Sequence, residues 1–310
     1  MTADTAPAVA PGPAAAGPGA RPGRSRHSIL RSAVNWGGLL PFAIYVGLGL
    51  ILPTIAIIIG AFQTDNGAFT FSNINVALHG VYLHGLVTSL ELSVIASIIP
   101  GVIGFLIAYA IFTARRGSVL RRVTITASGT FANFGGVPLA FLFIATLGTT
   151  GLLTGWLNAI GLNPYDHGFN LYTFSGVVLV YMYFQTPLMV LVILPSLEGL
   201  RPAWREAAAN LGASSWQYWR YVGGPVLRPA FLGCVLLLFG SALSAYATAQ
   251  ALTSGSIPLT SIQIGSFLNG NVLAGQTNVG KALALGMVLI IAIAMSLYAL
   301  AQRRAAKWLQ

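Results

Sequence analysis

The sequence predicts an all-α, polytopic membrane protein, built as a bundle of six apolar helices with both chain ends on the cytoplasmic side. Of the 310 residues, 55% are hydrophobic and only 7% are charged, which is too apolar for the surface of a soluble domain. The apolar residues gather in six runs of about 20 residues, each long enough to cross a bilayer. Arginines cluster at alternate ends of these runs, so topology can be predicted as well as fold.

Residues 1–30 differ from the rest of the chain. They are rich in Ala, Pro and Gly and contain no apolar run before the first arginines. A secretory signal has the reverse order, a basic start followed by an apolar core. Because such a segment cannot bury enough apolar surface to fold, we predict a disordered cytosolic tail.

Residues 31–310 are predicted to form one transmembrane domain. Its spans are expected near residues 39–62, 88–112, 124–147, 173–194, 229–249 and 282–301. Pro53, Pro100, Pro138 and Pro187 each fall inside an apolar run, where proline removes a backbone hydrogen bond and kinks a helix. We therefore expect kinked spanning helices that pack closely through small residues.

Cationic side chains orient the bundle, because Lys and Arg in short loops stay on the cytoplasmic side. Arginines precede the first span, lie between the second and third and between the fourth and fifth, and follow the sixth, whereas only Lys281 lies on the other side. Both termini are therefore predicted to be cytoplasmic. The formal net charge of +10 follows from this topology and does not indicate a nucleic-acid partner, since no basic face with interleaved aromatic residues is present.

Polar side chains inside the spans are costly in a bilayer and are therefore candidates for a solute path. The candidates are Glu91, Asn133, Tyr181, Gln185, Tyr246 and Gln250. Glu91 lies near the outer end of the second span, where a carboxylate could attract a cationic solute. The alternative is that Glu91 reaches the membrane interface or pairs with a partner subunit.

The sequence does not indicate an active site or a metal site. The four histidines lie in the tail or in external loops, and the single cysteine, Cys234, lies inside a span. Residues 275–282 fit the spacing of a phosphate-binding loop as far as Lys281, but Ala282 stands where Ser or Thr would bind Mg²⁺. We expect no catalytic residue, no bound metal and no cofactor in this chain. An ion-coupled secondary carrier stays open as an alternative, although only Glu91 lies anywhere near the membrane midplane.

The loop at residues 198–228, between the fourth and fifth spans, is predicted to be a bent pair of short helices. Pro202 is suited to the first turn of a helix, Gly212 to a left-handed cap, and Ser214 to the start of a second helix. The first helix presents Glu206 together with Ala207 and Leu211 to a groove on another protein. The alternative is an ordinary interfacial helix that lies on the lipid and is anchored by Trp204, Trp216, Tyr218 and Trp219.

This loop resembles the signature loop of the membrane permeases of ATP-binding-cassette (ABC) importers. The residues that match the signature are Glu206, Ala207, Ala208, Gly212, Val222 and Pro225. Two residues depart from it, since Gly224 replaces the usual leucine and Asn210 stands where relatives often have Asp. The resemblance extends from about residue 39 to the C-terminus and is closest in pattern to the polyamine-type (spermidine/putrescine) permease branch.

The resemblance implies a type I importer permease in the bacterial plasma membrane, a subunit that forms the solute path. It implies a second, different permease chain, two cytosolic ATPase subunits that bind ATP and Mg²⁺, and an extracytoplasmic solute-binding protein as partners. ATP hydrolysis would thus reside in a partner, and the chain itself would not be an enzyme. Coupling to the ATPase would involve Glu206, Ala207, Ala208, Leu211, Gly212 and Pro225. The implied solute is a small charged molecule such as a polyamine, with an aminophosphonate, iron(III) or thiamine as alternatives.

Overall fold

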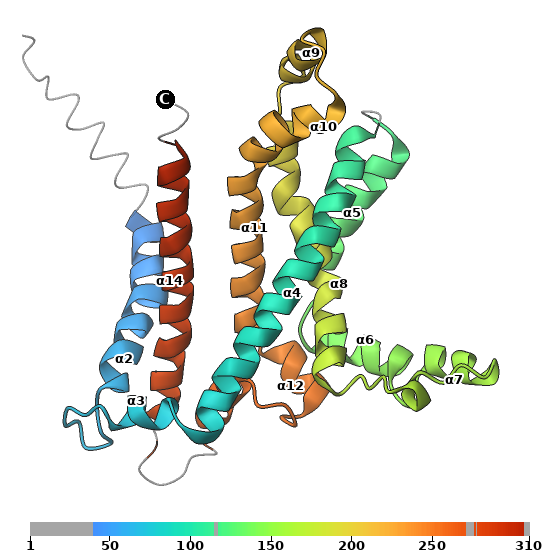
Figure 1. The fold of residues 1–310 in the computed structure, drawn as a ribbon. Helices are drawn as coiled ribbons and strands as arrows, with labels where there is room; N and C mark the ends of the chain where they lie inside the picture. Colours follow the sequence, from blue (N-terminus) through green and yellow to red (C-terminus); the bar gives the residue numbers. More distant parts are fainter. Residues whose placement is uncertain (1–39, 115–116, 271–275, 277, 307–310) are drawn as a thin grey trace, which may run out of the picture. The chain divides into compact units, whose positions relative to one another are not determined.

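The computed structural model describes residues 40–114, 117–270, 276 and 278–306. All regular structure in these residues is helical, apart from one isolated bridge between Gln63 and Phe69 (Figure 1). Six helical stretches among them are long and apolar enough to cross a membrane, so the predicted polytopic all-α fold is confirmed. These stretches are Leu40–Ala61, Gly80–Thr113, Val137–Ala159, Phe174–Glu198, Ser215–Ser244 and Val279–Leu300. The third is not one continuous helix, because a turn at residues 148–151 divides it. The predicted tail, residues 1–30, lies outside the described residues.

The chain divides after Thr54 into two units, and each is described by itself. The described part of the first unit is helical and contains a π-helical turn, η1 (Gly47–Ile51), just before α2 (Leu52–Ala61) begins. Pro53 has no N–H to donate, and a wider turn is one way for a helix to pass such a residue. The structure therefore has a π-helical turn just before Pro53, where the sequence predicted a kink.

The second unit contains the remaining helices. In chain order these are α3 (Ser72–Ala77), α4 (Gly80–Thr113), α5 (Val119–Asn133), α6 (Val137–Leu147), α7 (Leu152–Ala159), η2 (Pro164–His167), α8 (Phe174–Glu198), α9 (Pro202–Asn210), α10 (Ser215–Tyr218), η3 (Trp219–Gly223), α11 (Gly224–Ser244), α12 (Ala247–Thr253), α13 (Thr260–Leu268) and α14 (Val279–Ala306). The centre of this unit is α8, which packs against α4, α5 and α11 (Figure 1). Pro100 lies inside α4 and Pro187 inside α8, as expected.

Small residues bring α4 and α8 close together. A Cβ atom added to Gly104 would lie 2.6 Å from Cβ of Met189 and 2.7 Å from the main-chain oxygen of Thr186. Only hydrogen fits at such a separation, so the expectation that spans pack closely through glycine is confirmed at this position.

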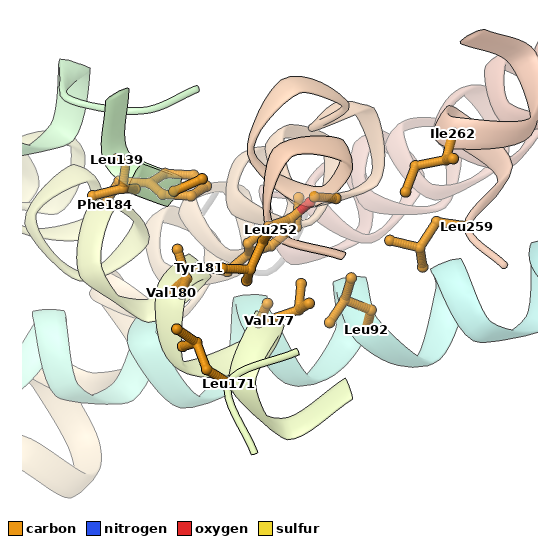
Figure 2. Packing of buried hydrophobic residues seen from close by; sticks show 14 residues of the cluster. Leu92, Leu139, Leu171, Val177, Val180, Tyr181, Phe184, Leu252, Leu259 and Ile262 are labelled. Atoms are coloured by element: carbon orange, nitrogen blue, oxygen red, sulfur yellow. The ribbon is translucent and has the colours of Figure 1, made fainter. Parts of the chain in front are cut away.

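The apolar core follows the length of α8. Near its start, side chains from α4, α6, α8, α12 and α13 form one cluster (Figure 2). Leu92, Leu139, Tyr181 and Leu252 are among its buried members. A second cluster surrounds the other half of α8 and joins it to α4 and α11. These two clusters fix both ends of α8, and the second lies next to the loop that follows it.

The third and fifth spans differ most from the predicted intervals, and the second begins at Gly80, eight residues before its predicted start. Residues 124–147 were expected as one helix, but α5 ends at Asn133 and α6 begins at Val137 with Pro138 in its first turn. Between them Gly136 has a positive φ of 76°, and its N–H donates a 2.9 Å hydrogen bond to Oγ1 of Thr248. Pro138 therefore begins a new helix and does not kink a continuous one.

The fifth span was expected at 229–249, but its helical stretch begins earlier, at Ser215. The π-helical turn η3 carries the helix past the glycine pair that precedes Pro225. The helix then ends at Ser244, because Ala245 is extended and a separate helix, α12, begins at Ala247.

Candidate functional site: the loop between α8 and α11

The first helix of the loop begins where the sequence predicts. Arg201 has an extended backbone at the N-cap position, and Pro202 follows in the first turn of α9. Proline is tolerated there because the first N–H groups of a helix have no partner within the helix. Three residues separate α9 from the end of α8 at Glu198, so the connection between α8 and α9 is short.

The bend after α9 has the hydrogen bonds of a Schellman motif. Gly212 has a positive φ of 77°. Its N–H donates to the main-chain oxygen of Ala209 at 2.9 Å, and the N–H of Ala213 donates to that of Ala208, also at 2.9 Å. These bonds satisfy the last carbonyls of the helix, and the positive φ favours glycine. The predicted left-handed cap at Gly212 is confirmed.

A capping box starts the second helix. Oγ of Ser214 accepts from the N–H of Gln217 at 3.3 Å, while the N–H of Ser214 donates to Oε1 of Gln217 at 2.7 Å. The Ser-x-x-Gln pattern could have been read from the sequence, but Gln217 was not singled out. The chain then continues through α10 and η3 into α11, and the ring of Trp219 packs edge-on against Tyr109 of α4 at 5.3 Å between centroids. The second half of the loop is thus fixed to the bundle.

The glycine at position 224, where the signature loop usually has leucine, has a structural explanation. A Cβ atom on Gly224 would lie 2.6 Å from the main-chain oxygen of Trp219, the residue at which η3 begins. The leucine typical of relatives would require this turn to shift. The π-helical turn η3 in its present form therefore requires a residue without a Cβ atom at position 224.

An apolar groove of about 570 Å³ lies between α9 and the start of α11. Its lining residues are Trp204, Ala207, Ala208, Leu211, Val222 and Val226. The four that come from α9 are spaced i, i+3, i+4 and i+7, so they share one face of the helix. Leu211 is 87% exposed.

Glu206 does not line this groove. At 100° per residue it lies about 160° around α9 from Trp204, on the opposite side of the helix. Its side chain is exposed, and the ion pair found within the described residues is a different one, between Arg121 of α5 and Glu198 at the end of α8. The loop therefore presents an apolar groove and, on another side, a carboxylate available to an external cation. Pro225 is also exposed and lies outside the groove lining, beside Val226.

The six candidates for a solute path occupy different environments. Tyr181 and Gln185 are fully buried and donate hydrogen bonds to main-chain oxygens of Ala245 and Leu238. Glu91 and Asn133 are exposed, and Asn133 donates to the main-chain oxygen of Gly129 at 2.9 Å within its own helix.

Tyr246 and Gln250 complete the set of six. Tyr246 lines a cavity of about 390 Å³ together with Ser261, Asn269 and other residues of α13 and α14, while Gln250 is partly buried in α12. The structure does not bring the six candidates into one cavity.

The chain has a clear family assignment. A family model described as the binding-protein-dependent transport system inner membrane component matches residues 101–307. The chain belongs to this permease family. The matched segment includes the whole loop between α8 and α11, so the family residues and the geometry described above coincide.

Individual relatives of the permease are distant. A probable sulfate transport system permease protein of Nephroselmis olivacea is 25% identical over 279 residues, covering 87% of this chain and 92% of the relative. A ferric transport system permease protein of Actinobacillus pleuropneumoniae is 25% identical over 262 residues, covering 82% of this chain and 36% of that protein. The chain thus corresponds to nearly the whole of one relative and to about a third of the other.

A solved structure supports the fold of the permease. A chain of a bacterial alginate ABC transporter, in complex with an alginate pentasaccharide-bound periplasmic protein, superimposes with a TM-score of 0.72. The superposition covers 90% of this chain and 96% of that chain at 18% sequence identity. The expected fold of an ABC importer permease is therefore confirmed.

Proposed function

We propose that this permease forms the solute path of an ATP-driven importer and is coupled to a separate cytosolic ATPase through the loop that contains α9. The observation that carries the proposal is the built geometry of this loop. The loop is a pair of capped helices joined by a bend. It connects α8 to α11, two helices that are central to the bundle. Its outer surface combines exposed apolar residues with the carboxylate of Glu206, which forms no ion pair among the residues that the structure describes.

Such a surface suits a protein partner that inserts an apolar segment into the groove between α9 and the start of α11 and places a cationic side chain beside Glu206. A charge-assisted hydrogen bond to Glu206 would contribute about 1.5–3 kcal/mol, enough to hold the loop to a moving partner. In this proposal Ala207, Ala208 and Leu211 provide close-fitting surface, Gly212 fixes the bend and Pro225 begins the helix that receives the motion. ATP and Mg²⁺ are bound by the partner.

The proposal places α9 and both chain ends on the cytoplasmic side of a bacterial plasma membrane, as the arginine distribution predicts. A second permease chain and an extracytoplasmic solute-binding protein complete the assembly. The alginate transporter supports this part, since its structure contains a periplasmic protein with bound ligand. The family assignment does not favour the ion-coupled carrier.

The substrate expectation needs correction. The relatives described above are named for sulfate and ferric transport, and the structural neighbour for alginate, so a polyamine is not supported. We propose a small charged solute, for which iron(III) stays among the alternatives. The solute path is proposed to include the exposed Glu91, Asn133 and Tyr246, whereas Tyr181 and Gln185 are bonded within the bundle.

The coupling can be tested with the assembled complex. We expect Glu206→Lys to reduce both co-purification of the ATPase and uptake-linked ATP hydrolysis in proteoliposomes, while Glu206→Asp, which keeps the charge, retains most of both. Unchanged hydrolysis and ATPase retention in Glu206→Lys would contradict the proposal.

A cross-linking experiment tests the alternative of a loop lying on lipid. Ala207→Cys is introduced into a chain whose one native cysteine has been removed by Cys234→Ser, and a short bifunctional reagent is added to the complex. A cross-link to the ATPase supports coupling, and exclusive labelling by a photoactivatable phospholipid supports the interfacial helix.

A further inference from the structure

Helix α7 is a short arm at the opposite end of α8 from the α9 loop. It follows α6 after a turn at residues 148–151 and leads through η2 to the start of α8. Its main packing partners are α6 and η2, and Figure 1 shows α6 and α7 extending away from α8. The helix is therefore attached to the bundle along one side only.

The exposed and buried sides of α7 are inverted relative to a soluble protein. Thr154 is the buried residue, with 4% exposure, whereas Leu152, Trp156 and Ile160 are exposed by 68%, 72% and 69%. These three large side chains are spaced i, i+4 and i+8, so they form one stripe along the arm. Leu153 lies beside the stripe and is also exposed. A contiguous apolar surface of this kind is a contact surface.

Length and connection place α7 at the membrane. Its eight residues span about 12 Å, far less than the 30 Å or so of hydrocarbon, so the helix cannot cross. The turn that joins it to the apolar helix α6 has four residues, too few for α7 to leave the membrane surface. The exposed apolar residues of α6, Phe141 and Leu142, continue the same kind of surface.

Charge also favours lipid as the occupant. Residues 123–165 contain no Asp, Glu, Lys, Arg or His, so no ionised side chain would be desolvated when this arm meets the bilayer. The position of Trp156 agrees with this, because tryptophan is enriched where the acyl region meets the headgroups. Asn158, on the other side of the helix, is exposed and can face the headgroups or water.

We infer that α7 is an interfacial anchor, lying in the plane of the membrane with Leu152, Trp156 and Ile160 in the lipid. It fixes the depth at which the chain enters α8. The lipid contact would persist whether or not α9 binds an ATPase, since the two surfaces lie at opposite ends of α8.

Spin labelling tests this placement. In a Cys234→Ser chain, Leu152→Cys, Trp156→Cys and Asn158→Cys are labelled separately, and Asn66→Cys, in an exposed turn outside the α9 loop, serves as the water-exposed reference. The full chain, alone and in its assembled complex, is reconstituted into phosphatidylcholine and phosphatidylglycerol vesicles. Collision rates of each label with oxygen and with a water-soluble nickel chelate are then measured.

We expect the labels at 152 and 156 to collide severalfold more with oxygen than with the nickel chelate, and the labels at 158 and 66 to show the reverse. Chelate access at 152 and 156 equal to that at 66 would show a water-exposed arm and overturn the inference. Loss of collisions with both reagents on assembly would show that a partner protein covers the stripe, which also overturns it.

A second measurement needs no substitution. A photoactivatable phospholipid incorporated into vesicles with the wild-type complex should label peptides that contain residues 152–162. Labelling of α4 or α14 peptides without any in this segment would contradict the anchor even if a cysteine variant failed to fold.

Discussion

The side-chain amide of Gln185 donates a 2.7 Å hydrogen bond to the main-chain oxygen of Leu238 and thereby ties α8 to α11. Gln185 has no exposed surface, and its Oε1 has no hydrogen-bond partner among the described residues. One turn earlier, the hydroxyl of Tyr181 donates to the main-chain oxygen of Ala245 at 2.9 Å. The two bonds therefore join α8 to α11 and to its C-cap, away from the ends of these helices that lead into the α9 loop.

Gln185→Glu is predicted to destabilise the protein more than Gln185→Leu. Leucine loses a hydrogen bond of about 0.5–1.5 kcal/mol but also removes a buried unpaired oxygen, so its net effect should be within about 1 kcal/mol. Glutamate places a carboxylate in a site with no cation, which costs about 3–5 kcal/mol when the carboxylate is ionised. Unfolding in detergent can be followed through the thiol of Cys234, which is buried and reacts with a thiol dye once exposed. A loss of stability in Gln185→Glu equal to that in Gln185→Leu would contradict the buried position of residue 185.

Tyr181→Phe is predicted to cost about 1 kcal/mol, the usual net contribution of one hydrogen bond. The cost stays moderate because the oxygen of Ala245 also accepts from Oγ of Ser261 at 3.4 Å. Tyr183→Phe is the matched control, since Tyr183 packs against Phe131 and Phe143 and would keep both ring contacts. Equal stabilities of the two variants in thermal unfolding would show that the Tyr181 bond contributes nothing.

Gly104→Ala tests the close approach of α4 to α8. The added Cβ would meet Met189 and the main-chain oxygen of Thr186, and overpacking of this kind costs about 1–3 kcal/mol. Gly129→Ala on α5 is the control, because a Cβ there meets no atom within 4 Å and alanine is the better helix former. We expect a lower unfolding midpoint for Gly104→Ala only, and a similar loss in both would exclude a packing cause.

The parts of the fold that were predictable depend on local chemistry. Runs of apolar residues predict the spans, and Pro202 with Gly212 predicts the bend of the loop, because each acts on its own stretch of backbone. The break between α5 and α6 also has a local signal, since Gly135 and Gly136 precede Pro138, but the bonds that fix it could not be predicted from this stretch. It is held by Thr248, which lies 112 residues further along the chain and bonds the main chain of Gly136.

The roles of the polar residues in the spans could likewise not be predicted from the local sequence alone. The sequence marks Tyr181 and Gln185 as polar groups in apolar helices, which agrees equally with a solute path and with internal bonding. Only the position of α11 decides that their donors meet main-chain oxygens. Residues such as Glu91, which face away from the chain's own core, stay candidates because a partner or solute would have to satisfy them.

Charge reversal at the root of the loop should be nearly neutral for stability. Arg121 and Glu198 form an ion pair between α5 and the end of α8, and Glu198 is substantially exposed. Such pairs contribute about 0–1 kcal/mol. We expect Glu198→Arg to lower the unfolding midpoint slightly at low salt, and Arg121→Glu combined with Glu198→Arg to restore it. A double variant that is no better than Glu198→Arg alone would mean that the two residues do not interact.

Gly212→Val is predicted to loosen the bend of the α9 loop while leaving the bundle folded. The positive φ of 77° is unfavourable for any residue with a Cβ, at roughly 1–2 kcal/mol, and more so for a β-branched one. Gly199→Ala is the matched control, since the backbone there has φ of −71° and an added Cβ would make only ordinary contacts, the nearest at 3.4 Å. Hydrogen exchange should therefore accelerate in α9 of Gly212→Val and stay unchanged in Gly199→Ala.

Two substitutions at Gly212 separate the shape of the loop from its charge. Gly212→Asn should be milder than Gly212→Val, because asparagine tolerates the left-handed region better. If the bend positions α9 for a partner, the amount of ATPase that co-purifies should be highest with Gly at position 212, lower with Asn and lowest with Val. Hydrogen exchange in α9 should become faster in the same order. Retention of the ATPase at wild-type level in Gly212→Val, with exchange in α9 accelerated, would show that the partner does not need the bend and would leave Glu206 as the main determinant of contact.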